Sequence, residues 1–236
     1  MARPRYPRSS GPLPPPLPPE TRTVGQLVAE TIRLYGRRFW LALPLGLPLA
    51  VLDEISFRRS LNVQTVILWA FSPLLTLTFA AAAAIVGNVR PTPRVLLSAL
   101  AAGIVVFAPF PVLARLFLLP ALALLAFAGL AVPAAVLERL GPVDAIRRGV
   151  ALGRVDYVHA LGGIATLAIV YGLSRYALLF LLRTQGNTAE RIAGFISDIV
   201  LSPLLFLGPA MLYVDQAARA RLRASAGGAA VRSSSR

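Results

Sequence analysis

Two charged side chains, Arg175 and Asp198, lie inside otherwise apolar tracts of this sequence. Arg175 comes seven residues before the end of one predicted helix at 182, and Asp198 comes six residues after the start of the next at 192. In antiparallel neighbours both would lie about 10 Å from the same helix ends, so the spacing predicts an ion pair. Either charge alone in hydrocarbon would cost at least about 2.5 kcal/mol. The pair could relay a proton or substrate, or clamp the two helices together; we favour the clamp.

Four other ionisable residues could take part in chemistry. Asp53 and Glu54 are adjacent, and adjacent residues of a helix do not face one site, so they make a poor acid and base pair. Arg115 could bind an anion or anchor a turn at the membrane surface, and we favour the anchor. His159 is the only histidine, too few for a metal cluster. Nucleotide-binding and hydrolase motifs do not occur, so the sequence predicts no enzyme, no metal site and no cofactor.

Apolar helices must position these groups. The chain has 236 residues, of which 56% are hydrophobic and 14% charged, and this is too apolar for an ordinary soluble domain. Residues 95–137 contain one charged side chain, Arg115, and are about twice as long as one crossing of the hydrocarbon layer needs. The pattern predicts an all-α fold, a six-helix transmembrane bundle within residues 23–216. The expected spans are 39–57, 61–87, 95–114, 116–137, 158–182 and 192–214.

Two basic amphipathic helices are expected to lie at the cytoplasmic membrane surface. In residues 23–38, apolar side chains recur every three or four positions, and Thr23 and Gln26 have capping-box spacing. A second such helix is expected to begin at Pro142, which suits a first helical position. Residues 1–22, rich in Pro and Arg, and residues 217–236, rich in Arg and small residues, are predicted to be disordered tails.

The distribution of arginine predicts the orientation. With both termini in the cytoplasm, eighteen arginines lie on that side and five on the other, as the positive-inside rule requires. The formal charge of +14 is expected to meet anionic lipid headgroups and not nucleic acid, because the basic residues flank apolar segments. The predicted location is a bacterial cytoplasmic membrane. Lipids are the main expected partners, with a partner protein as a further one.

Two segments carry a family resemblance: VPAAVLERLGPVDAIRRGVALGRVDY at 132–157 and LYVDQAARAR at 212–221. The first has a proline-containing span that ends in a glutamate, then a glycine and an Ala-x-x-Arg-Arg helix. Together they resemble the glycerophosphoryl diester phosphodiesterase membrane-domain family and its multi-pass relatives. Gly149 departs from that pattern, where serine is usual, as do Tyr157 and Val158, where tryptophan is common. Because the attached phosphodiesterase domain of some members is absent from this sequence, the resemblance implies a membrane module without hydrolase activity.

The resemblance also implies six recurring polar positions: Glu138, Arg147, Arg148, Tyr213, Asp215 and Arg219. We expect them to form a cytoplasmic polar belt that holds the second amphipathic helix against the ends of the last three spans. Asp215 is expected to pair there with Arg147 or Arg148.

Three function classes are compared. The expected function is a non-enzymatic membrane module that contacts lipids or partner proteins, and an apolar groove in a closed bundle would favour it. The alternative is a small transporter or permease subunit that uses Arg175 and Asp198, which broken helices around a water-filled cavity would favour. An intramembrane enzyme would need several ionisable groups at one depth, and only this one pair is evident.

Overall fold

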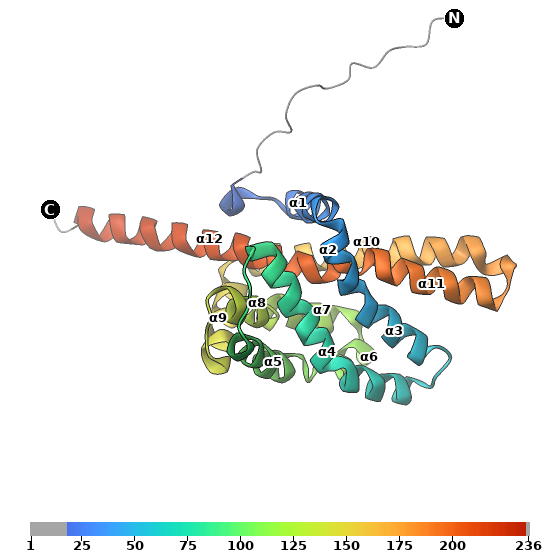
Figure 1. Ribbon diagram of the computed structural model, residues 1–236. Coiled ribbons are helices and arrows are strands. Elements are labelled where there is room, and N and C mark those ends of the chain that lie inside the picture. Colours follow the sequence, from blue (N-terminus) through green and yellow to red (C-terminus); the bar gives the residue numbers. More distant parts are fainter. Residues whose placement is uncertain (1–17, 235–236) are drawn as a thin grey trace, which may run out of the picture.

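The computed structural model describes residues 18–234, with side chains at all of these positions except 185, 187 and 227–234 (Figure 1). Throughout this part of the chain the secondary structure is helical, without strands. Six segments are long and apolar enough to cross a membrane, and this confirms the all-α prediction and its count of six apolar helical segments. They are Phe39–Ser56, Leu61–Gly87, Pro93–Leu116, Leu118–Leu137, Tyr157–Leu182 and Thr188–Ala226.

Within and between these segments the helices follow in this order: α1 (Val24–Arg37), α2 (Phe39–Ala42), α3 (Leu47–Ser56), α4 (Leu61–Gly87), α5 (Pro93–Phe107), α6 (Phe110–Leu116), α7 (Leu118–Ala128), α8 (Ala131–Leu137), α9 (Pro142–Val155), α10 (Tyr157–Leu182), α11 (Asn187–Leu201) and α12 (Pro203–Ser234). Three short 3-10 turns accompany them, η1 (Pro19–Thr21), η2 (Leu43–Gly46) and η3 (Arg183–Gln185).

Four of the six segments are broken into shorter helices, where the sequence predicts continuous ones. Pro44 lies in η2, Pro109 lies between α5 and α6, and Pro203 begins α12. Proline has no backbone N–H and its ring clashes with the preceding turn, so each break falls where a helical hydrogen bond is already lost. The break between α7 and α8 has no proline and falls at Gly129 and Leu130.

Helix α9 packs against the break between α7 and α8 through two glycines. A Cβ on Gly149 would lie 2.4 Å from the Ala131 nitrogen, and a Cβ on Gly153 would lie 2.3 Å from the Phe127 carbonyl oxygen. Atoms in van der Waals contact need about 3.5 Å or more, so neither position has room for a side chain. The backbones therefore touch directly, and α9 is held on the bundle.

Helix α1 packs on α10 and α12, as the view in Figure 1 also shows. Its capping box is present: Gln26 N–H donates to Thr23 Oγ1, and Thr23 N–H donates to Gln26 Oε1 at 2.8 Å. Leu27 lies fully buried beneath it. Farther along, the hydroxyl of Tyr35 donates to the Val200 carbonyl oxygen at 2.8 Å and ties α1 to α11. The predicted helix at 23–38 is therefore present and packed on the bundle.

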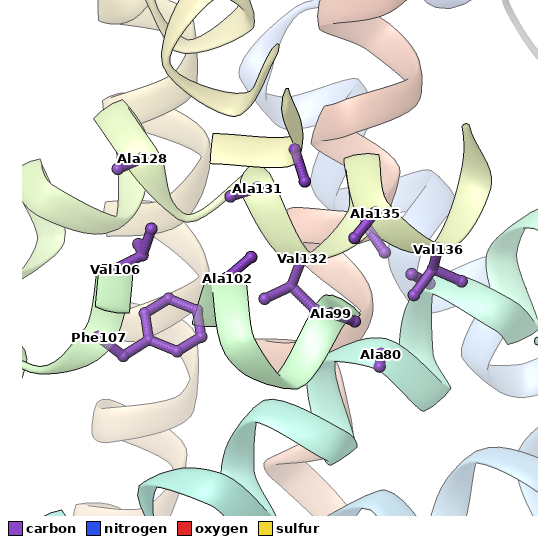
Figure 2. Close-up of a cluster of buried hydrophobic side chains, with 13 residues drawn as sticks. Ala80, Ala99, Ala102, Val106, Phe107, Ala128, Ala131, Val132, Ala135 and Val136 are labelled. Carbon is purple, nitrogen blue, oxygen red and sulfur yellow. The ribbon is translucent and has the colours of Figure 1, made fainter. Parts of the chain in front are cut away.

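Small side chains bring α4, α5 and α8 together in the core (Figure 2). Ala80, Ala99, Ala102, Ala131 and Ala135 are fully buried there. Between membrane helices there is little hydrophobic driving force, because lipid tails are as apolar as the side chains. Close contact between small residues supplies the attraction instead.

The ends of the chain differ from the predicted tails. Helix α12 continues to Ser234, where a disordered tail from 217 was expected. Alanine and arginine are strong helix formers, and Arg219 and Arg223 bond to Asp156 and to the Val155 carbonyl oxygen at the end of α9. At the other end Arg22, expected in the N-terminal tail, is buried with 6% of its surface exposed. Residues 1–17 of that predicted tail lie outside the described residues.

Candidate functional site

Arg175 on α10 lies at the centre of a group of polar side chains that we name the Arg175 cluster: Asp53, Tyr171, Arg175 and Asp198. The Nε–H of Arg175 donates to Asp198 Oδ1 at 2.9 Å, and its Nη2 donates to Asp53 Oδ2. The hydroxyl of Tyr171 donates to the same Asp198 oxygen. The structure thus brings together the two residues that the sequence paired, and it adds a carboxylate from α3 and a hydroxyl from α10.

The side chains of the Arg175 cluster differ in how much of their surface is exposed. Asp198 is completely buried, the Arg175 side chain is 25% exposed, and the Asp53 side chain is 44% exposed. A buried carboxylate is stable only when it is paired and hydrogen-bonded, and Asp198 receives two donors on one oxygen. The guanidinium of Arg175 therefore links a buried carboxylate to one that reaches solvent.

A polar cavity of about 270 Å³ adjoins the Arg175 cluster. Its lining comes from α3, the turn after it, the start of α4, the end of α10 and the start of α11. A second ion pair lies in the same wall, where Arg191 Nη2 donates to Glu54 Oε1. Asp53 and Glu54, which seemed poor partners for each other, therefore each pair with a different arginine.

An apolar cavity of about 380 Å³ lies deeper between the helices. Residues of α3 to α7, α10 and α12 line it. Among the described residues of this lining, only Ser72 and Tyr171 bring a polar side-chain group, and the Tyr171 hydroxyl is already bonded to Asp198. The remaining lining is aliphatic, aromatic, proline or glycine, so the cavity suits a hydrocarbon chain and offers little to a polar solute.

The two cavities lie one helical turn apart on three separate helices. On each helix, one residue lines the apolar cavity and the residue four positions away lines the polar one: Leu49 and Asp53 on α3, Leu68 and Gln64 on α4, and Tyr171 and Arg175 on α10. Four residues of α-helix rise about 6 Å. A polar compartment is therefore stacked on an apolar one along the bundle.

A separate polar group surrounds Glu138, at the end of α8. Arg148 Nε–H donates to both carboxylate oxygens of Glu138, at 2.9 and 3.1 Å, and the Tyr213 hydroxyl donates to Oε1. These three expected members of the polar belt thus come together and join α9 and α12 to the end of α8. Arg147 lies apart from them, highly exposed, with Nη1 3.8 Å from Asp144.

Asp215 has a different partner from the one expected. Its Oδ1 lies 2.9 Å from Nη1 of Arg22, and neither Arg147 nor Arg148 contacts it in the part of the chain that the structure describes. Arg219 donates to Asp156 and to the carbonyl oxygen of Arg22. The belt is therefore two groups: Glu138 with Arg148 and Tyr213, and Asp215 with Arg22 beside Arg219.

Arg22 was missed because it borders a proline-rich segment. A local signal did exist, since Arg22 directly precedes the capping residue Thr23, whose position the α1 capping box fixes.

Compared with known proteins, the chain matches no family model, no curated protein and no solved structure.

Proposed function

We propose that this chain is a non-enzymatic, multi-pass protein of a bacterial cytoplasmic membrane, and that it binds a lipid chain in the apolar cavity. The observation that carries the proposal is the lining of that cavity, in which the described residues include only two polar side chains. Its volume of about 380 Å³ lies in the range of small-molecule sites. A polar solute would lose its hydrogen bonds to water there, whereas a hydrocarbon chain loses none.

The proposed orientation places both termini in the cytoplasm. The Glu138 and Asp215 groups then lie at the cytoplasmic end, and the Arg175 cluster lies at the opposite end of α10. Exposed arginines at the cytoplasmic end, such as Arg147, would meet anionic headgroups, each contributing about 1 kcal/mol. The resemblance to the glycerophosphoryl diester phosphodiesterase membrane-domain family supports a membrane module of this kind, with a partner protein as a further contact.

A cavity-filling substitution tests the lipid-binding proposal. Gly172 lines the apolar cavity, and a Cβ added there would meet no atom within 4 Å, so Gly172→Phe adds a large side chain at this lining without a clash at the Cβ. The measurement is native mass spectrometry of the full chain released from micelles that contain bacterial phospholipids. We expect the wild type to retain lipid and Gly172→Phe to lose most of it.

Leu173→Phe is the matched control. Leu173 is the next residue of α10, is 65% exposed and does not line the cavity, so its variant should retain lipid as the wild type does. Equal lipid retention by the Gly172 and Leu173 variants would overturn the proposal. So would a wild type that leaves the micelle without lipid.

The transporter alternative is favoured by the broken spans and by the buried pair of Arg175 and Asp198. A transport path must admit water to the middle of the bundle at some stage of its cycle. The chain has no cysteine, so Ser72→Cys places a single thiol in the apolar cavity. Rapid reaction with a membrane-impermeant thiosulfonate would favour transport, and protection of the thiol would favour the lipid site.

A further inference from the structure

We propose that the polar cavity binds the headgroup of the same lipid, and that this headgroup is zwitterionic, with a phosphate ester and a primary ammonium group, as in phosphatidylethanolamine. The inference rests on the proposed function, since it assigns the headgroup of a lipid whose chain lies in the apolar cavity. In such a lipid a glycerol unit joins the acyl chain, held by an ester, to the phosphate of the headgroup. The protein presents matching compartments one helical turn apart on α3, α4 and α10.

Donors for a phosphate are present in the polar cavity. The bonds from Arg175 to Asp198 and Asp53 use two of the five N–H donors of its guanidinium. Arg191, which lines the same cavity, gives Nη2 to Glu54 and keeps half of its side-chain surface exposed. Guanidinium groups bind phosphate oxygens through paired N–H donors, so each arginine has donors for a phosphate oxygen without leaving its carboxylates.

The balance of charge favours a headgroup that carries both signs. Three carboxylates and three guanidinium groups line the cavity: Asp53, Glu54 and Glu190, and Arg58, Arg175 and Arg191. Asp198, bonded to Arg175 just behind this lining, adds another carboxylate. An anionic headgroup therefore finds no excess of positive charge there. A zwitterion can place its phosphate near an arginine and its ammonium near a carboxylate such as Glu190.

The aromatic side chain in the cavity favours a primary over a quaternary ammonium group. Quaternary ammonium ions are bound over aromatic faces, whereas a primary ammonium donates hydrogen bonds to carboxylates. Phe57 lines the cavity, but the guanidinium carbons of Arg58 and Arg191 already lie 5.3 and 5.6 Å from its ring centroid. The ring is thus already in contact with arginine, as are Asp53 and Glu54, and Glu190 is the lining carboxylate that has no ion pair within the described residues.

The test is competition between headgroups on the full chain. The protein is released for native mass spectrometry from micelles that contain equal amounts of phosphatidylethanolamine, phosphatidylglycerol, phosphatidylcholine and diacylglycerol with the same chains. We expect phosphatidylethanolamine to be retained over each of the others by about tenfold or more, the effect of one good charge-assisted contact. Glu190→Gln should reduce that preference several-fold and leave diacylglycerol retention unchanged, which also shows that the variant is folded.

Arg183→Gln is the control for charge removed at the same end of the bundle. Arg183 stacks on Phe180 and does not line the polar cavity, so the preference should persist in this variant. Equal retention of all four lipids would overturn the headgroup assignment and leave the lipid-chain proposal standing. The assignment would also fail if Glu190→Gln behaved as Arg183→Gln does. Absence of every lipid from the wild type would instead overturn the proposed function.

Discussion

Arg22 and Asp215 form an ion pair 2.9 Å long, although 193 positions separate them in the chain. Both side chains are buried, at 7% and 0% exposure. The pair ties the segment that precedes α1 to the middle of α12, and Arg219 strengthens the tie by donating to the Arg22 carbonyl oxygen. The start of the described chain is therefore part of the folded bundle.

Loss of the Arg22 side chain should lower the free energy of unfolding. Arg22→Ala removes the guanidinium from the buried Asp215 carboxylate and leaves it a longer contact, 4.0 Å, with His159 Nε2. Removal of one member of a buried pair typically costs about 3 to 5 kcal/mol. The free energy of unfolding in mixed detergent micelles measures the effect. Arg37→Ala, which removes an exposed arginine from the end of α1, should change it by less than about 0.5 kcal/mol. Equal effects of the two substitutions would contradict a buried pair.

Coupling between Arg175 and Asp198 can be measured with a double-mutant cycle. Arg175→Ala and Asp198→Ala should each destabilise the protein, because each leaves an opposite charge without its partner. The double variant should be less destabilised than the sum of the two, by about 0.5 to 3 kcal/mol. A strictly additive result would show that the 2.9 Å contact contributes nothing to stability.

The packing of α9 predicts opposite effects for two glycine substitutions. Gly149→Ala would place a Cβ 2.4 Å from the Ala131 nitrogen and should destabilise the protein by about 1 to 3 kcal/mol. Gly25→Ala, on the exposed face of α1 with nothing within 4 Å, should stabilise it by up to about 1 kcal/mol. Thermal unfolding of both variants measures the contrast. Gly149→Ser should behave as Gly149→Ala does, because its Cβ would occupy the same position against Ala131.

Local patterns predicted the helices well and their interruptions poorly. The span expected at 61–87 has the bounds of α4, because hydropathy and the following turn are read from adjacent residues. Pro109 was expected to help the chain turn after the span 95–114, but the break falls within that span. A proline in an apolar tract can kink a helix or end it, and the packing of neighbouring helices decides. The spacing of residues in the sequence does not show how neighbouring helices pack, so it could not predict this break.

Distance along the chain separates the ion pairs that could be predicted from those that could not. Arg175 and Asp198 lie on consecutive spans joined by a short turn, so their offsets from that turn fixed their relative depth. Asp53 lies 122 positions from Arg175, and its approach depends on how α3 packs beside α11. The polar cavity, which Asp53 and Arg175 both line, could therefore not be predicted from any local pattern in the sequence.

The membrane orientation can be tested with single cysteines, since the chain has none of its own. Ser60, Phe117 and Thr184 follow the first, third and fifth candidate spans, and Thr92 and Gly141 follow the second and fourth, so the two sets are expected on opposite sides of the membrane. We expect a membrane-impermeant maleimide to label cysteines at the first three positions in intact cells. Cysteines at Thr92 and Gly141 should react only after the cells are opened.

The physical reason is the distribution of arginine, with eighteen on the proposed cytoplasmic side and five on the other. Moving arginines across the membrane against this bias is unfavourable during insertion, so one orientation should dominate. Labelling of Thr92→Cys and Gly141→Cys in intact cells, with protection at the other three positions, would reverse the orientation. Labelling of Phe117→Cys on a different side from Ser60→Cys would be a stronger contradiction, because it would mean that the segments 61–87 and 93–116 do not both cross the membrane.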